Sequence, residues 1–222
     1  MPILKTKNED FFKNWTPEMA YVLGFFAADG NMIKNKRGAH FIEFQITDKD
    51  ILGKIKRLLG SNHKITARKR NVKWNTIYRL QIGSKSIFND LSQIGLTPNK
   101  SKTIKLPFVP DKYFSHFTRG YFDGDGNATI AKYIRADRNN KNTTTILSGF
   151  TSGSKNFLKA LHAKLKKLSD ISGGTFYYNK GYRLCFSVND SLSLYKFLYK
   201  DVENNLYLSR KKKIFEKYFK LA

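Results

Sequence analysis

Two aspartates, Asp29 and Asp125, end two copies of one short pattern that could do chemistry. An aromatic residue, a glycine, a phenylalanine and a closing Asp-Gly-Asn have the same spacing in residues 21–31 and, 96 residues later, in 117–127. Each copy also carries small residues four positions apart, which lie on one face of a helix and allow two helices to pack closely. Such packing would bring the two carboxylates together at the negative ends of their helices.

Paired carboxylates in that position repel each other unless a cation lies between them. Oxygen ligands with few nitrogen or sulfur donors favour a hard divalent ion such as Mg²⁺. Because a metal ion can activate water for attack on a phosphodiester, the pair indicates phosphodiester hydrolysis if the substrate is a nucleic acid. An Asp-Gly pair also ends many helices with no such role. The duplication, with Asn and a strand-like stretch after both copies, favours the functional interpretation.

The charge of the chain indicates a polyanionic partner. Among 222 residues, 41 are Lys or Arg and 17 are Asp or Glu, so the formal net charge is +24 and the pI is about 10.0. A charge of this size opposes compaction by self-repulsion. The basic residues are spread along the chain rather than gathered on one amphipathic helix. A broad nucleic-acid-binding face is therefore favoured over an anionic membrane surface, and we expect no membrane partner.

Composition excludes several classes of protein. A hydrophobic content of 41%, with 14% aromatic residues, excludes a disordered basic tail. The single cysteine, Cys185, excludes an internal disulfide framework and a multi-cysteine zinc site. The longest apolar run, 21–28, is too short to cross a bilayer, and we expect a reduced, soluble, intracellular protein. No metal-ligand spacing links the four histidines, which we expect at the surface or as caps: His40, His63, His116 and His162.

Each half of the chain repeats one order of elements after its motif helix. Strand pairs between helices favour an α+β fold with antiparallel sheets, built from two pseudo-symmetric αββαββα halves over 1–96 and 114–222, joined by a Pro-containing linker over 97–113. A pseudo-twofold protein suits duplex DNA. In the first half the expected elements are the strand His40–Ile46, the helix Asp50–Leu59, the strands Lys64–Arg70 and Thr76–Ile82, and the helix Lys85–Ile94. In the second they are Thr143–Phe150, Lys155–Leu168, Thr175–Tyr178, Tyr182–Val188 and Ser191–Tyr199.

The two motifs, VLGFFAADG over 22–30 and TRGYFDGDG over 118–126, resemble the two copies of the LAGLIDADG motif, and the chain resembles a single-chain LAGLIDADG homing endonuclease. The resemblance implies that the motif helices pack at the central interface and that two curved antiparallel sheets form a DNA-binding saddle. It also implies two or three shared divalent ions, Mg²⁺ for turnover, with Ca²⁺ able to substitute without supporting it. The implied ligands are the carboxylates of Asp29 and Asp125 and the backbone carbonyls of Ala28 and Gly124.

The resemblance further implies basic residues around the metal-bound water. In the first half the matching residue is Lys100, with Lys102 next. In the second half the register is ambiguous, and we favour Lys211, with Arg210 close behind. Relatives often place a Gln after the second strand, where this chain has Asp48 in the first half and about Ser152 in the second.

Alternation along the expected strands indicates candidates for contact with DNA. Arg, Gln and Asn can make paired hydrogen bonds to guanine or adenine in the major groove. In the second strand we expect Ile42, Phe44 and Ile46 toward the core and Phe41, Glu43 and Gln45 on the opposite face. The candidates in the first half are Asn31, Ile33, Asn35, Arg37, Gln45, Arg68, Arg70, Arg79 and Gln81. In the second half they are Thr129, Tyr133, Arg135, Tyr178, Lys180 and Arg183.

The leading hypothesis is a monomeric, Mg²⁺-dependent, site-specific endonuclease that cuts both strands of a long, non-palindromic DNA target and leaves a staggered end. An alternative is an intron RNA maturase or nucleic-acid-binding protein on the same fold, but such non-cleaving forms lose motif acids that this chain retains. The abundance of Lys, Asn, Ile, Phe and Tyr indicates an AT-rich genome. We therefore expect an intron-encoded protein in an organelle (mitochondrion or chloroplast) or in a bacterial cytoplasm, and not an intein copy.

Overall fold

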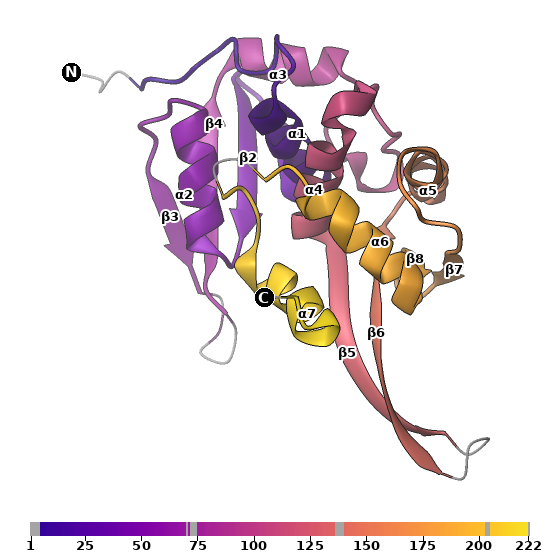
Figure 1. Ribbon diagram of the computed structural model, residues 1–222. Helices are drawn as coiled ribbons and strands as arrows, with labels where there is room; N and C mark the ends of the chain where they lie inside the picture. Colours follow the sequence, from indigo (N-terminus) through magenta and orange to yellow (C-terminus); the bar gives the residue numbers. More distant parts are fainter. Residues whose placement is uncertain (1–4, 70, 72–74, 136–139, 203–204, 222) are drawn as a thin grey trace.

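Two four-stranded antiparallel sheets flank a central pair of helices, α1 and α4 (Figure 1). The computed structural model describes residues 5–69, 71, 75–135, 140–202 and 205–221. The strand orders are β1-β2-β4-β3 and β5-β6-β8-β7, so the second sheet repeats the first. The α+β class and the pseudo-symmetric halves predicted from the sequence are confirmed.

The first half follows the predicted order of elements. Helix α1 begins after its N-cap Thr16, whose hydroxyl accepts a hydrogen bond from the Met19 amide at 3.0 Å. It ends before Gly30, the first residue of the next strand. The elements are α1 Pro17–Asp29, β1 Gly30–Lys34, β2 His40–Ile46, α2 Lys49–Leu58, β3 Ile65–Arg68, β4 Ile77–Gly83 and α3 Lys85–Gln93.

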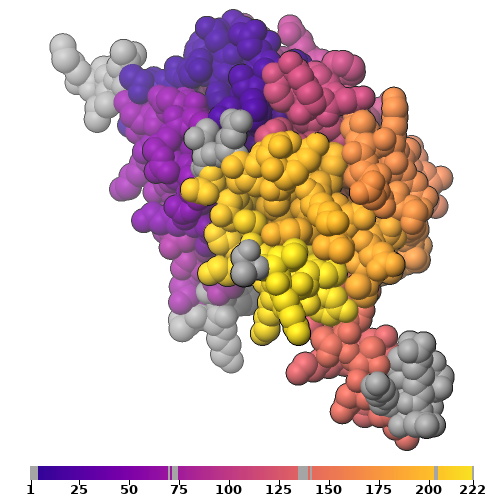
Figure 2. Space-filling view, in the orientation of Figure 1, coloured from indigo at the N-terminus to yellow at the C-terminus, as the bar shows by residue number. Residues whose placement is uncertain are grey.

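The second half has the same order and one additional helix. Its elements are α4 Phe114–Asp125, β5 Gly126–Arg135, β6 Lys141–Ser152, α5 Lys155–Leu168, β7 Thr175–Tyr178, β8 Tyr182–Phe186 and α6 Val188–Tyr199. The additional helix, α7 Ser209–Phe219, was not predicted. Strands β5 and β6 are longer than β1 and β2, and their hairpin extends beyond the rest of the molecule (Figures 1 and 2).

The segment between the halves is packed on the body. It forms two short 3-10 turns, η1 Lys100–Lys102 and η2 Asp111–Tyr113, and Val109 between them is fully buried. The Lys100 side chain is buried as well, at 6% exposure. No helix in the described part of the chain is long and apolar enough to span a bilayer.

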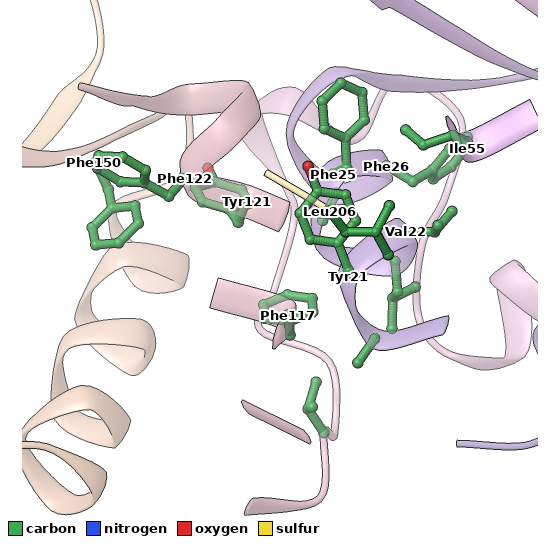
Figure 3. Packing of buried hydrophobic residues seen from close by; sticks show 14 of the residues in the cluster. Tyr21, Val22, Phe25, Phe26, Ile55, Phe117, Tyr121, Phe122, Phe150 and Leu206 are labelled. Carbon is green, nitrogen blue, oxygen red and sulfur yellow. The ribbon is translucent and has the colours of Figure 1, made fainter. Parts of the chain in front are cut away.

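One hydrophobic core holds the two halves together. Helix α1 is buried from Met19 to Ala27 because it is apolar on every face, as expected of a helix at the centre of a domain. Aromatic side chains of α1 and α4 lie close together in this core, as Figure 3 shows for Tyr21, Phe25, Phe117 and Tyr121.

Candidate active site and nucleic-acid interface

The backbones of helices α1 and α4 lie in close contact, because the residues at the contact are glycines. A Cβ on Gly24 would overlap the carbonyl oxygen of Phe117, and a Cβ on Gly120 would overlap that of Tyr21. Near the ends of the helices, a Cβ on Gly124 would overlap the methyl group of Ala28. The small residues of the motif therefore lie in the contact between the halves, as their spacing predicted.

The close approach brings Asp29 and Asp125 into one site. Both carboxyls are half-buried, each as the last residue of its helix. Burial, and then the nearby charge of Asp125, raise the pKa of Asp29 to about 6. Burial also raises the pKa of Asp125, against the opposing effect of Lys211 and Lys100. Two carboxylates that disfavour each other's charge form a site that a cation would stabilise.

Lys211 caps the end of α4. Its ammonium group donates to the backbone carbonyls of Phe122 at 2.7 Å, Asp123 at 2.8 Å and Gly126 at 2.6 Å, and more weakly to Gly124 at 3.2 Å. These carbonyls carry the partial negative charge of the helix terminus. The Lys211 side chain, 6% exposed, is thereby fixed beside the two carboxylates.

Lys100 has the same place at the end of α1. Its Nζ donates to the carbonyl oxygen of Gly30, the residue equivalent to Gly126, and lies 5.4 Å from the ring centre of Phe26. The Lys211 Nζ lies 5.4 Å from the ring centre of Phe122, the matching motif residue. The structure therefore favours Lys211 over Arg210 as the counterpart of Lys100.

The two lysines interact electrostatically with the two aspartates. Burial lowers the pKa of Lys100 and of Lys211 to about 8, although the charges of Asp29 and Asp125 act in the opposite direction on both. The second choices, Lys102 and Arg210, are exposed. Arg210 lines a hollow of about 300 Å³ together with Asp29 and Gly124.

The residues present suit a hard divalent ion. In the part of the chain that the structure describes, no cluster of three His, Cys, Asp or Glu residues forms a preassembled metal site. Asp29 and Asp125 supply two carboxylates here, and the carbonyl ligands that the family resemblance implies belong to the residues just before them, Ala28 and Gly124. This set contains oxygen donors only, as Mg²⁺ and Ca²⁺ prefer.

Asp123, the sixth residue of the second motif, has a structural part that the sequence did not reveal. Its buried carboxylate accepts hydrogen bonds from the Tyr21 hydroxyl at 2.7 Å and from the Leu208 amide at 3.0 Å. Leu208 is the N-cap of α7. One side chain thus links the first motif helix to the start of the helix that carries Lys211.

The two positions where relatives often have a Gln both make local hydrogen bonds. Asp48 is the N-cap of α2 and accepts from the Ile51 amide at 3.3 Å. Ser152 is buried, and its hydroxyl accepts from the Ser154 amide at 3.1 Å. Each of the two side chains therefore has a local hydrogen-bond partner.

Two buried polar residues of α4 lie away from the carboxylates. His116 is 5% exposed and accepts at Nδ1 from Arg119 at 2.9 Å, so the expectation of a surface or capping histidine is wrong at this position. Arg119 also donates to the carbonyls of Leu206 and Leu198, at 2.9 and 2.8 Å. The pair ties α4 to the C-terminal segments, an arrangement that sequence spacing could not indicate.

The outer face of the first sheet collects most of its predicted DNA-contacting residues. The strand pairs Asn31–Glu43, Glu43–Gln81 and Gln45–Arg79 place these residues on one face, with Ile33 beside them. Arg68 lies on the same face, in a groove of about 320 Å³ shared with Arg79. Ile42, Phe44 and Ile46 are buried on the opposite face, as predicted.

Two candidates of the first half lie beyond that face, and a third is outside the described part of the chain. Strand β1 ends at Lys34, so Asn35 and Arg37 lie in the turn beyond it, where alternation no longer applies. The Asn35 side chain accepts from the amides of Arg37 at 3.0 Å and Ala39 at 2.8 Å and thus shapes the turn. Arg70 lies outside the described residues.

The second sheet presents a different outer face. Thr129, Tyr133 and Arg183 lie on it, since Ala128 and Leu184 beside them in sequence point into the core. Tyr178 does not share this face: it lies on the opposite one against Tyr182, with ring centres 5.2 Å apart.

Three further positions complete the second half. Tyr177, which was not a candidate, pairs with Arg183 on the outer face. Lys180 lies in the hairpin turn with a φ of 53°. Arg135 ends β5, and its side chain lies outside the described part of the structure.

The first half of the chain matches a known family model. Residues 16–95, which run from the cap of α1 to just beyond α3, match the family model described as a LAGLIDADG-like domain. Two proteins of Methanocaldococcus jannaschii are similar in sequence. The uncharacterized protein MJ0398 is 31% identical over 135 residues, which are 59% of this chain and 46% of that protein. The DNA-directed RNA polymerase subunit Rpo1C is 30% identical over 129 residues, 56% of this chain and 14% of that subunit. The chain thus spans less than half the length of either relative.

Solved structures share the fold over nearly the whole chain. The meganuclease I-SmaMI bound to uncleaveable DNA superposes with a TM-score of 0.63 at 12% identity, covering 92% of this chain and 89% of that one. The LAGLIDADG meganuclease I-AabMI, bound to uncleaved DNA, gives 0.64 at 13% identity, with 93% and 90% covered. The homing endonuclease I-WcaI bound to its DNA recognition sequence gives 0.59 at 17% identity, with 93% and 91% covered.

Proposed function

From the LAGLIDADG-like domain of its first half and the LAGLIDADG homing-endonuclease fold of the chain, we propose that the protein is a site-specific endonuclease that hydrolyses both strands of a duplex DNA target with the help of Mg²⁺. The observation that carries the proposal is the meeting of four residues at the α1–α4 contact. Asp29 and Asp125 end the two motif helices, and Lys100 and Lys211 bind the carbonyls just beyond those ends.

In this proposal the two aspartates hold the divalent ions between the halves. The raised pKa of each carboxyl means that its negative charge is unfavourable in this buried site. A bound cation would stabilise the two negative charges. A divalent ion bound there would act as a Lewis acid toward the phosphate and would lower the pKa of a water molecule bound to it. Because each half contributes one carboxylate, a single chain contains a complete site, which supports action as a monomer.

In this proposal the lysines transfer protons and stabilise negative charge. A lysine with a pKa of about 8 can release a proton as the ammonium form and accept one as the neutral amine near neutral pH, which suits general acid–base work at Nζ. In this proposal the same groups also offset the negative charge that develops on the phosphate. Their bonds to the helix ends hold them in place before the substrate arrives, so little rearrangement is needed during the reaction.

The sheets supply recognition. The outer face of the first sheet is rich in Arg and Gln, whereas that of the second carries Thr, Tyr and one described arginine, Arg183. Two unlike faces suit two unlike half-sites, which supports a non-palindromic target. The net charge of +24 supplies the attraction to phosphates that a long duplex requires.

A cleavage selection tests the proposal. Purified protein would be incubated with Mg²⁺ and a large random duplex library, and the cut ends would be sequenced beside those from an Asp125→Asn protein. We expect one long asymmetric site with staggered ends, cut only by the wild type. Tight binding to structured RNA with no DNA cut would instead favour the maturase alternative.

A further inference from the structure

A buried carboxylate lies at the centre of the outer face of the first sheet. The Glu43 side chain is 3% exposed although it points away from the hydrophobic core. Arg79 donates to it from Nε and forms an ion pair through a terminal nitrogen. The amide of Gln45 donates to its other oxygen, and the amide of Gln81 donates at 3.3 Å. Three neighbouring side chains therefore converge on one acid.

The acid fixes the orientation of its neighbours. A carboxylate only accepts hydrogen bonds, so each amide must turn its nitrogen toward Glu43. Gln45 and Gln81 each keep a carbonyl oxygen and one N–H, the pair of groups that recognises adenine in the major groove. Arg79 uses its Nε edge on Glu43 and keeps N–H groups at its tip for the O6 and N7 atoms of guanine.

The acid also makes this spot unsuitable for a phosphate. A carboxylate on the face of a strongly basic protein repels the DNA backbone locally and offsets the charge of Arg79, whose side chain is 43% exposed. An arginine held in this way is better suited to a base edge than to a phosphate. Loss of side-chain freedom before binding reduces the entropy that recognition costs.

The second sheet provides a natural comparison. In the two registers Phe44 corresponds to Phe150 and Leu80 to Leu184, since each phenylalanine pairs with the glycine after its motif aspartate and with that leucine. Arg79 therefore corresponds to Arg183. The positions of the acid and the two amides are occupied in the second sheet by Gly149, Thr151 and Cys185.

No carboxylate in the described chain pairs with Arg183, whose Nε contacts the Asn179 carbonyl at 3.5 Å. A side chain at Gly149 is excluded, because its Cβ would overlap the carbonyl oxygen of Leu184. The same arginine position is thus held by an acid in one half and lacks that support in the other.

We propose that Glu43 is the positioning residue for base recognition by the first half: it holds Arg79, Gln45 and Gln81 as readers of purine edges, so the centre of the first half-site is recognised more strictly than the equivalent part of the second. This inference rests on the proposed recognition of duplex DNA. It does not depend on cleavage.

The test is a binding selection on random duplexes in Ca²⁺, with base preference measured at every position. Wild type would be compared with Glu43→Gln, which keeps the size of the side chain and removes its charge. Arg79→Gln and Arg183→Gln form a matched pair at equivalent positions. Thermal unfolding of each protein checks that it is folded, and the preference of Glu43→Gln in the second half-site serves as an internal control.

We expect Glu43→Gln to lower base preference about tenfold at about three neighbouring base pairs of one half-site, and to leave the other half-site unchanged. Arg79→Gln should lower preference at the same base pairs. The double variant should lose little more preference than Arg79→Gln alone, because both changes disrupt the same Glu43–Arg79 interaction. Arg183→Gln should produce a smaller loss at the related base pairs.

Three results would overturn the inference. An equal rise in affinity for all sequences in Glu43→Gln would mean that Arg79 contacts phosphate and that Glu43 merely weakens it. An unchanged preference would mean that Glu43 does not position the readers. Selective duplex binding without cleavage would refute the nuclease reaction alone, whereas absence of any selective duplex binding would overturn both.

Discussion

Lys100 and Lys211 are equivalent residues of the two halves, 111 positions apart in sequence rather than the 96 that separate the motifs. Each Nζ donates to the carbonyl of the glycine that follows a motif aspartate, and each lies over the motif phenylalanine. The unequal spacing arises because Lys100 lies in the connecting segment, whereas Lys211 lies on α7. The two lysines make matching contacts although their spacing in the sequence differs from that of the motifs. This indicates that the site itself requires a lysine in each half.

Replacing either lysine should impair cleavage. We expect Lys100→Met and Lys211→Met to slow single-turnover cleavage of the selected target by about a hundredfold, a typical effect of removing a group that transfers protons. Lys211→Met should also lower the free energy of unfolding, because four carbonyls at the end of α4 lose their donor. Lys102→Met and Lys213→Met, at exposed neighbouring positions, are the controls. Equal losses in the controls would show a general charge effect instead.

The contact between the motif helices should not tolerate a methyl group. Gly24→Ala and Gly120→Ala each place a Cβ against a backbone carbonyl of the other helix, and we expect losses of about 3 kcal/mol in the free energy of unfolding. Gly53→Ala is the matched control. Gly53 lies within α2 with no atom near its added Cβ, so this change should stabilise the protein by about 0.5–1 kcal/mol. Denaturant unfolding would measure all three, and similar losses at the three sites would contradict the close approach.

His116 should make the protein sensitive to mild acid. Burial, then the charge of Arg119, lower its pKa from 6.5 to about 4, so the folded protein binds fewer protons than the unfolded chain between these values. Stability should therefore fall as pH drops through this range, by roughly 2 kcal/mol at pH 5 relative to neutral pH.

The raised pKa values of Asp29 and Asp123, both about 6, act in the opposite direction, since these carboxyls favour the folded state when protonated. The measurement is accordingly the difference in unfolding free energy between wild type and His116→Gln as a function of pH. Gln can still accept from Arg119 but does not titrate. A difference that is independent of pH between 4 and 7 would contradict the buried neutral histidine.

Binding to DNA should depend steeply on salt. If recognition uses six to ten phosphate contacts, affinity should fall roughly a thousandfold or more between 50 and 200 mM salt. Titrations of the selected duplex at several salt concentrations would give the slope. An almost flat dependence would be inconsistent with a broad basic face on the duplex.

Patterns within single elements allowed much of the fold to be predicted. The segment HFIEFQI was predicted as a strand with the bounds that β2 has, and residues 155–168 were predicted as the helix that is α5. The duplicated motif predicted α1, α4 and their contact. Helix α7 was missed because its start is fixed by the Asp123 carboxylate, 85 residues away, and because Lys-rich sequence conceals the apolar spacing of Phe215 and Phe219.

Side-chain partners were harder to predict than elements. Sequence placed Glu43 on the outer face with Gln45 but could not show Arg79 beside it, since that contact depends on the register between β2 and β4. The face on which Tyr178 lies was equally hard to predict, because a shift of one residue in a strand exchanges its two faces. The site roles of Asp29, Asp125, Lys100 and Lys211 remain predictions that the geometry supports.

Single-turnover cleavage by Asp29→Asn and Asp125→Asn proteins is the most direct test of a metal site shared between the halves. With the selected target and Mg²⁺, we expect neither variant to produce double-strand breaks, while both bind the duplex with an affinity within about threefold of wild type, since phosphate contacts supply most of it. Cleavage of both strands at the wild-type rate by either variant would contradict the assignment of that aspartate to the site.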